Sequence, residues 1–428
     1  MNERLRRTYL GFYENELTNN ILSFWLPRCE DTVWGGFLNC FTNRGDRLVS
    51  TDKYTWSQGR FVWMFSKLAS MKLFTASQRS EFLRLAGTGA HFLLDHCLIR
   101  DDGPVRCTFL TDRTGAPKLV DGGERLDMSI YADCFAIAGL GKYAAVAENR
   151  AAFDFAKRLY ESAISLYRAG TFQTLPYPLS PRFRAHGLPM IFQNVARELY
   201  DAALLFDADF ASVLLGDMDA CSADILAHFT DENHLIHEVI TADNRFFDTL
   251  LGQHINPGHS IEDLWFHLDT ADRTGHPERL AALAAIGKAT LEAGWDKEYG
   301  GILHFADVRG GEPRFDAGET ADEPMSKQTV TGWGDKLWWV HSEALYTTML
   351  LYARTGDEAF LDWHNRVMDY TYETFPNPDR ELREWIQIRK RDGSPQDKVV
   401  ALPVKDPYHI VRNLVLLIEL LEGCGDEG

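Results

Sequence analysis

The sequence has few cysteines, and their arrangement provides neither a disulfide framework nor a metal site. There are 7 cysteines in 428 residues, none of them in a Cys-X-X-Cys pair, and no cysteine–histidine spacing matches a zinc site. Because the number is odd and the positions are scattered, free thiols in a reducing compartment are the simplest explanation. We therefore predict a cytoplasmic protein that carries no metal.

Long apolar runs, an excess of positive charge and cofactor motifs are also missing. No segment has the composition of a membrane span or a signal peptide. With 44 basic and 62 acidic residues the net charge is −18, which disfavours nucleic acids and anionic membranes as partners. The sequence contains no P-loop, no dinucleotide fingerprint and no Gly-X-Ser-X-Gly elbow, so we expect no cofactor.

The pattern that is present is helical. Alternating runs of β-branched residues are scarce, and most of the chain has the periodicity of helices of about 12 to 20 residues. The clearest predicted helices cover residues 56–73, 80–97, 128–147, 151–167, 190–205, 261–272, 338–354, 359–375 and 409–421. Short turn-flanking segments recur between them, which is typical of a repeated helix–loop–helix unit.

The helices fall into two classes. Some, such as the one around Trp63, are apolar on more than one face, whereas the 359–375 helix has a polar face. This division indicates a buried inner layer and an exposed outer layer. Without a Pro/Ser-rich linker, we expect one domain over residues 1–428. A double-layered helical ring satisfies the pattern, although hydropathy does not distinguish a ring from a solenoid.

His259 is the first candidate for chemistry, in the segment Asn256-Pro-Gly-His-Ser-Ile-Glu-Asp263. Ser260 and the aspartate three residues later form a capping-box pattern, which predicts a helix start just after His259 and puts Glu262 in the first turn. A helix N-terminus favours neutral imidazole, the form that a general base needs. The alternative is that His259 only hydrogen-bonds a turn.

His409 is the second candidate. Asp406 and Pro407 fit the N-cap and first position of the last helix, so His409 is expected in its first turn. If both helices belong to the inner layer of a ring, they run in the same sense and begin on the same side. Two histidines 150 residues apart (409 − 259) would then share one site.

Aromatic and cationic side chains complete the candidates. In Lys336-Leu-Trp-Trp-Val-His-Ser-Glu343, the two tryptophans, the histidine and the glutamate cannot all face one way on a helix. We expect one tryptophan in the core and the other as a platform for a sugar ring. Arg60 must either pair with a carboxylate or face a polar cavity, because burial of an unpaired guanidinium is costly.

Together these segments resemble the N-acylglucosamine 2-epimerase family from Trp34 to Arg412. The most specific blocks, in family order, are Asp52-Lys-Tyr-Thr-Trp-Ser-Gln-Gly-Arg60, Pro257-Gly-His-Ser-Ile-Glu262, Gly294-Trp-Asp-Lys-Glu-Tyr-Gly-Gly301, Lys336-Leu-Trp-Trp-Val-His-Ser-Glu343 and Lys405-Asp-Pro-Tyr-His-Ile-Val-Arg412. The resemblance implies an all-α (α/α)6 barrel with short hairpin-like loops, and a metal-independent sugar epimerase or aldose–ketose isomerase.

The resemblance also implies roles for particular residues. His259 and His409 are similar to the family's acid/base pair, and Arg60 to the residue that polarises the carbonyl or O2 of the sugar. The residues implied to bind substrate are Glu262, Trp338, His341, Glu343, Trp385 and Asn194. Gln193-Asn194 stands where relatives acting on mannose or cellobiose tend to have a histidine, which favours an N-acylhexosamine.

The leading hypothesis is therefore a 2-epimerase of an N-acylhexosamine, of the N-acetylglucosamine/N-acetylmannosamine type, or of a related hexose. An arginine can stabilise the enediolate while two histidines remove and return the C2 proton. An aldose–ketose isomerase of the mannose/fructose type is the alternative. A glycoside hydrolase, which would need two carboxylates such as Glu262 and Glu343, and a non-catalytic sugar-binding protein rank lower. The sequence leaves open whether the chain acts alone or as a homodimer.

Overall fold

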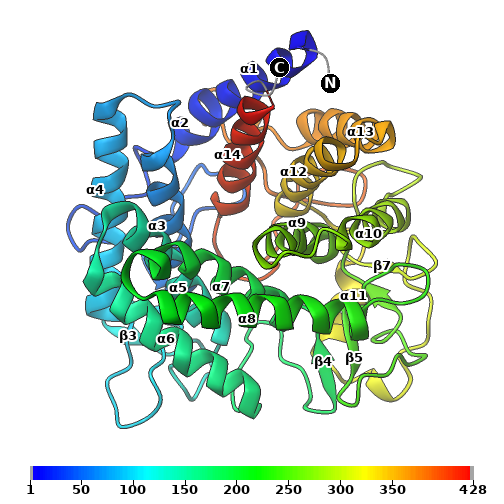
Figure 1. The fold of residues 1–428 in the computed structure, drawn as a ribbon, viewed down its shortest axis with the longest axis horizontal. Helices are drawn as coiled ribbons and strands as arrows, with labels where there is room; N and C mark the ends of the chain where they lie inside the picture. Colours follow the sequence, from blue (N-terminus) through cyan, green and yellow to red (C-terminus); the bar gives the residue numbers. More distant parts are fainter. Residues whose placement is uncertain (1–2, 425–428) are drawn as a thin grey trace.

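The computed structural model describes residues 3–424 and consists of two layers of helices arranged in a ring (Figure 1). The inner helices are α3 (Thr55–Ser70), α5 (Ile130–Ala147), α7 (Gly187–Phe206), α9 (Pro257–Thr274), α12 (Trp338–Thr355) and α14 (Tyr408–Gly423). Each inner helix packs against the next, and α14 packs against α3. That last contact closes the ring, so the predicted (α/α)6 barrel is confirmed over a solenoid.

The outer layer covers the ring with one helix for each inner helix. Its members are α4 (Ala76–Phe92) on α3, α6 (Arg150–Ala169) on α5, α8 (Ala208–Asp224) on α7, α10 (Arg279–Gly294) on α9, α13 (Glu358–Thr374) on α12, and α1 (Glu3–Asn15) on α14. The π-helical segments η1 (Glu16–Ile21), η2 (Leu93–Cys97) and η3 (Ile225–Phe229) continue α1, α4 and α8, and α2 (Leu22–Trp25) follows η1. The first and last helices are therefore neighbours in space.

Small antiparallel sheets lie where the inner helices begin. The pairings are β1 (Lys53–Tyr54) with β2 (Leu110–Thr111), β2 with β3 (Pro117–Lys118), β4 (Phe183–Ala185) with β5 (Val239–Thr241), β6 (His254–Ile255) with β7 (Ala306–Asp307), and β8 (Lys336–Leu337) with β9 (Ile388–Arg389). Four of the strands lead into inner helices: β1 and β8 end at the residue before α3 and α12, and β4 and β6 end one residue earlier than that before α7 and α9. The connection after β7 carries η4 (Gly318–Thr320) and α11 (Pro324–Gly332). The loops thus decorate one end of the ring.

One inner helix is apolar enough to invite a different interpretation. Helix α5 has the length and a mean hydropathy, 1.2, compatible with a membrane span, but 67% of it is buried inside the protein. It packs between α3 and α7, so its apolar surface forms part of the core of the ring.

Two glycines allow α3 and α5 to approach closely. A Cβ atom added at Gly59 would lie 2.1 Å from the carbonyl oxygen of Phe135, and one added at Gly139 would lie 2.3 Å from the carbonyl oxygen of Gly59. No side chain fits at either position without moving a backbone. The contact matters for the site because Arg60 follows Gly59 directly.

We expect Gly59→Ala to lower the free energy of unfolding by roughly 2–4 kcal/mol, because the added methyl group forces α3 and α5 apart. Chemical denaturation measures the effect. Gly216→Ala on α8 is the matched control: nothing lies within 4 Å of the added Cβ, so the gain in helix propensity of about 0.5–1 kcal/mol should appear instead. Equal stabilities of the two variants would contradict the close approach.

Candidate active site

The N-terminal turns of all six inner helices line one cavity. Its helical lining consists of Trp56, Ser57 and Arg60 of α3, Tyr131 and Phe135 of α5, Gly187, Met190, Ile191 and Asn194 of α7, His259 and Glu262 of α9, Trp338 and Trp339 of α12, and His409 of α14. Residues between Val400 and Asp406 cover another side. The predicted convergence of the two histidines is therefore confirmed.

This placement determines the electrostatics of the cavity. Unpaired N–H groups give each helix N-terminus a partial positive charge, and six of them converge here. Their field opposes protonation of histidines in the first turns and favours negative charge on a bound molecule. The cavity is suited to an anionic intermediate next to neutral imidazoles.

His259 lies in the first turn of α9 with one ring nitrogen directed at a carboxylate. Its Nδ1 is 2.9 Å from Oε1 of Glu238, and since an ionised carboxylate only accepts, Nδ1 carries the hydrogen. Nε2 has no hydrogen-bond partner among residues 3–424, and the side chain is 27% exposed. His259 thus presents an accessible Nε2 to the cavity.

The β4–β5 sheet positions the carboxylate that holds His259. Ala185 pairs with Val239 in this antiparallel ladder, and the ladder continues with the backbone N–H of His186 donating to the carbonyl of Glu238 at 2.9 Å. The N–H of Glu238 in turn donates to the carbonyl of His254 at 3.3 Å. Glu238 is therefore held by backbone pairing on both sides.

His409 lies in the first turn of α14 between a carboxylate and a guanidinium. Its Nδ1 is 2.6 Å from Oε1 of Glu343, and its Nε2 is 3.1 Å from Nη2 of Arg60. A guanidinium only donates, so Nε2 of His409 accepts from Arg60. Nδ1 lies 3.3 Å from Nη2 of Arg412 but makes its shorter contact with the carboxylate of Glu343, to which it donates. His409, like His259, therefore directs Nε2 to the cavity.

The indole of Trp339 lies between the two imidazoles. Its ring centroid is 5.5 Å from that of His259 and 5.6 Å from that of His409. Gly258 permits this position, because a Cβ there would come within 2.5 Å of the indole. A flat apolar platform flanked by two bases suits a sugar ring that packs its C–H face on the indole.

Arg60 both pairs with a carboxylate and lines the cavity, so its two predicted environments are combined. Its Nη1 donates to Asp406, and its guanidinium carbon lies 4.1 Å from the ring centroid of Phe135 and 4.9 Å from that of Tyr408. The ion pair and the aromatic rings hold the cation rigidly. It can therefore stabilise an oxyanion without moving.

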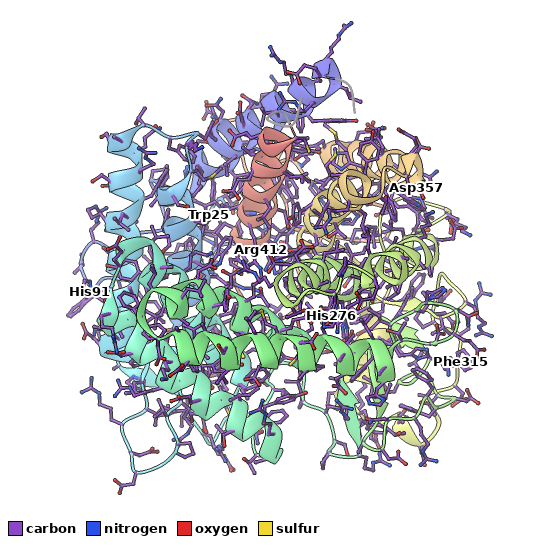
Figure 2. All side chains as sticks on the ribbon, viewed as in Figure 1. Trp25, His91, His276, Phe315, Asp357 and Arg412 are labelled. Atoms are coloured by element: carbon purple, nitrogen blue, oxygen red, sulfur yellow. The ribbon has the colours of Figure 1, made fainter. Side chains whose placement is uncertain are left out.

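Arg412 neutralises two buried carboxylates beneath the cavity. Its Nη2 donates to both Glu262 of α9 and Glu343 of α12, and the guanidinium is fully buried (Figure 2 labels Arg412 on α14). Burial opposes ionisation of Glu343, but Arg412 and the hydrogen bond from His409 outweigh it and lower the pKa of that carboxyl group. Glu343 therefore remains ionised and orients His409.

The predicted substrate-binding residues separate into three groups. Asn194, Glu262 and Trp338 line the cavity, whereas Glu343 contacts His409 from behind. His341 and Trp385 form the third group, outside the cavity.

His341 and Trp385 are not part of the cavity lining. Both ring nitrogens of His341 are bonded, Nε2 accepting from the N–H of Ile302 at 3.0 Å and Nδ1 donating to the carbonyl of Leu337 at 2.8 Å. Burial lowers the pKa of His341 to about 3, so it is a neutral structural group. Trp385 is buried and donates to Glu16 at 2.8 Å. The family resemblance implied that both residues bind substrate, but here they support the loops around the site.

The predicted helix starts need correction. Helix α9 begins at Pro257 with Asn256 as its N-cap, not at the Ser260 capping box, so His259 is inside the first turn. Pro257 suits the first position because it needs no N–H partner there. Helix α14 begins at Tyr408, one residue later than predicted, although Asp406 still accepts from the N–H of Tyr408 at 2.9 Å.

The sequence analysis did not identify Glu238 as a partner of His259 or Asp406 as a partner of Arg60. It also did not decide which of Trp338 and Trp339 is the platform. Glu238 lies 21 residues before His259 and has no periodic relation to it, so only the sheet pairing reveals the contact. Asp406 was assigned a capping role, which it has, but its second oxygen pairs with Arg60. The paired tryptophans did signal a platform.

Two groups of side chains have the composition of a metal site: His186, Glu238 and His259, and Glu262, Glu343 and His409. In the second group the Arg412 guanidinium contacts both carboxylates. In the first group Glu238 accepts directly from His259. Hydrogen-bonded ion pairs therefore account for both groups.

A second cavity adjoins the first. It shares Tyr131, Tyr177, His259 and Trp339 with the first cavity. Of the catalytic candidates, His259 therefore lines both cavities.

The fold and the site together define a helical-barrel carbohydrate enzyme of the isomerase class. Residues 35–413 match the model of the N-acylglucosamine 2-epimerase (GlcNAc 2-epimerase) family. The chain belongs to this family and is a sugar 2-epimerase.

Individual relatives agree. The chain is 29% identical over 408 residues to the N-acylglucosamine 2-epimerase of Bos taurus, covering 94% of this chain and 89% of that protein. It is 25% identical over 411 residues to a cellobiose 2-epimerase of Ruminococcus albus, covering 92% and 94%. A sugar epimerase from a ruminal bacterium has a similar fold, with a TM-score of 0.76, 19% identity and coverage of 96% and 98%.

We expect Arg412→Leu to lower the free energy of unfolding by about 3–5 kcal/mol, because it leaves Glu262 and Glu343 buried without a counter-charge. Arg354→Leu is the control, since its ion pair with Asp272 is on the surface and should contribute below about 1 kcal/mol. Urea titration of both variants measures the difference. Similar losses would show that the buried charges are not the source of the stability.

Proposed function

We propose that this epimerase interconverts the C2 epimers of an N-acylhexosamine, of the N-acetylglucosamine/N-acetylmannosamine type, without a metal ion. The observation that carries the proposal is the pair of imidazoles beside the Trp339 indole, with Arg60 hydrogen-bonded to one of them. Each imidazole offers a basic Nε2, and each is held through Nδ1 by a buried glutamate.

This arrangement suits inversion at C2. In the ring-opened aldose, removal of the C2 proton places negative charge on the carbonyl oxygen, where the Arg60 guanidinium and the helix N-termini stabilise it. One histidine removes the proton from one face, and the other, once protonated, returns a proton to the opposite face. His259 and His409 belong to different helices, α9 and α14, so they can approach the substrate from opposite sides.

The wall contributed by α7 supports an N-acyl substituent. Met190 and Ile191 provide an apolar surface, and Asn194, one turn further along the helix, also lines the cavity. The buried Oδ1 of Asn194 has no hydrogen-bond partner within the described residues. It can accept from the amide N–H of the substrate while the acyl methyl group contacts the apolar side chains.

The alternatives require arrangements that the cavity does not favour. A hydrolase needs two independent carboxyl groups, but Glu262 and Glu343 share the same Arg412 nitrogen. An aldose–ketose isomerase would use the same bases, with the proton returned to C1. The family membership favours return to C2.

We also propose one catalytic domain in a cytoplasmic protein. All seven cysteines are free and six are buried, which suits a reducing compartment. The closure of the ring by α14 on α3 supports a single domain. Whether two chains associate is a question for sedimentation analysis.

We expect the wild-type protein to incorporate deuterium at C2 of N-acetylmannosamine in D2O, with N-acetylglucosamine as the product. His259→Asn and His409→Asn should each lower turnover by on the order of 10²–10⁴, and dialysis against a chelator should leave the wild type active. NMR follows both exchange and product. His276→Asn, a part-exposed histidine bonded to Glu278, is the control.

Other outcomes would point elsewhere. Fructose as the main product from mannose would identify an isomerase, and new reducing ends from an oligosaccharide would identify a hydrolase. Sugar binding without any C2 exchange would leave a binding protein. A panel that includes cellobiose tests whether the adjoining cavity admits a second sugar.

We expect Asn194→Ala to lower kcat/KM for N-acetylmannosamine by up to about tenfold, the value of one lost neutral hydrogen bond, and to leave kcat/KM for mannose unchanged. Gln193→Ala is the control, because the neighbouring amide donates to Thr270 at 2.9 Å and does not line the cavity. Equal losses on both sugars in the Asn194 variant would refute the acyl contact.

A further inference from the structure

His186 is a fully buried histidine that takes no part in the proposed reaction. It lies between β4 and α7, with Nε2 2.8 Å from Oδ2 of Asp263 and Nδ1 3.7 Å from Oε2 of Glu238. Its ring centroid is 6.3 Å from that of His259. Both of its ring nitrogens therefore face carboxylates, and one of these carboxylates is the group that holds His259.

This geometry favours an imidazolium at position 186. A neutral imidazole can donate to only one carboxylate and would direct a lone pair at the other. Burial disfavours the charged form, but Asp263 and Glu238 outweigh it and raise the pKa of His186 to about 9. Glu238 responds in the opposite direction: despite its burial, His259 and His186 lower the pKa of its carboxyl group.

The second histidine has a matching arrangement. His409 is bonded to Glu343, Glu343 to the cation Arg412, and Arg412 to Glu262. His259 is bonded to Glu238, and Glu238 faces the cation His186, which is bonded to Asp263. In both cases a chain of contacts runs from the histidine to a glutamate, from the glutamate to a cation, and from the cation to a second carboxylate, which we call the terminal carboxylate. The terminal carboxylates, Glu262 and Asp263, are consecutive residues of α9.

We propose that His186 is a positioning residue which, as an imidazolium held between Glu238 and Asp263, keeps His259 in the neutral form that accepts the C2 proton. The inference rests on the proposed epimerase chemistry. Glu238 would otherwise face His259 alone and would favour the imidazolium form of His259. The imidazolium of His186 also faces the carboxylate of Glu238, so it offsets part of the negative charge that His259 experiences. Its positive charge also opposes protonation of the nearby His259 ring.

Other titratable groups also face this cluster. Those on neighbouring elements are His267, His254, Tyr131, Tyr177 and His304. Burial lowers the pKa of His254 and His304 and raises that of Tyr131 and Tyr177, so these four are neutral near pH 7. These four groups add no charge that could replace that of His186. His267 contacts the same oxygen of Asp263 as His186, with its Nε2 at 3.1 Å, and so lies on the far side of Asp263 from the carboxylate that holds His259.

The two cations differ in one respect that matters for pH. Arg412 stays charged at any working pH, whereas His186 loses its proton near pH 9. A raised histidine pKa stabilises the folded state fully below the unfolded value of about 6.5, and this contribution is lost as the pH rises through 9. The electrostatic effect of His186 on His259 should likewise be lost as the pH rises through about 9, where His186 becomes neutral.

The test is the pH profile of kcat/KM for His186→Gln on the proposed N-acetylhexosamine. Removal of a charge at this separation should move the acid limb to higher pH by about one unit or more. Activity near pH 6.5 should then fall about tenfold relative to wild type, while the two profiles converge above the pH at which His186 is neutral. Asp263→Asn should shift the limb in the same direction, because His186 loses its stronger counter-charge.

The control is His364→Gln, which removes another fully buried histidine, in α13, whose Nε2 is 2.7 Å from the hydroxyl of Tyr13. A purely structural loss would lower kcat/KM by the same factor at every pH. If kcat/KM of His186→Gln is lower than that of wild type but its acid limb lies at the same pH, the proposal is overturned. If His186→Gln does not fold, an unmoved limb in Asp263→Asn has the same meaning.

A second readout separates this inference from the proposed function. NMR titration of the His259 imidazole in wild type and His186→Gln needs no substrate, and the variant should take up the proton at higher pH. If the wild type shows no C2 exchange but the titration shifts, the proposed substrate is wrong and the role of His186 stands. If the wild type exchanges the C2 proton but His259 titrates identically in wild type and His186→Gln, the proposed function stands and the role of His186 is wrong.

Discussion

The ion cluster around Arg412 is the interaction on which the site depends. This guanidinium on α14 is fully buried and contacts Glu262 of α9 and Glu343 of α12, so it joins three helices of the inner ring. Two carboxylates could not remain ionised at this depth without it. Because Glu343 remains ionised, it accepts from Nδ1 of His409, and Nε2 of that ring is left as the acceptor nitrogen, directed at Arg60 and the cavity.

The direction of the inner helices explains why the chemistry lies at one end of the ring. All six begin on the same side, and their N-termini surround the cavity. Partial positive charge from backbone N–H groups then favours neutral imidazoles and an enediolate. The small sheets on the same side have a structural task, since the β4–β5 ladder sets Glu238 beside His186 and β6 leads into the helix of His259.

Much of this could be predicted from the sequence, because it rests on local patterns. Periodicity located nine of the principal helices and their two layers, and the turn and capping residues located His259 and His409 near helix starts. The predicted caps were wrong by one residue for α14 (407 − 406) and by four for α9 (260 − 256), where Asn256 and Ser260 both have side chains that cap helices. His341 and Trp385 were wrongly placed in the pocket, because a motif does not specify which side of a helix or loop faces the cavity.

What the sequence by itself determined is the family and the helical periodicity, and it singled out two histidines and Arg60 as candidates for the chemistry. Only the tertiary structure decided that α14 closes on α3, that Trp339 lies between the imidazoles, and that Glu238 and Glu343 hold them. The physical reason is range. Helix propensity and capping act over a few residues, whereas a buried charge is stabilised by whichever partner the fold brings within hydrogen-bonding distance. His186 shows this most clearly, because its charge depends on Asp263, which is 77 residues away along the chain and 2.8 Å away in space.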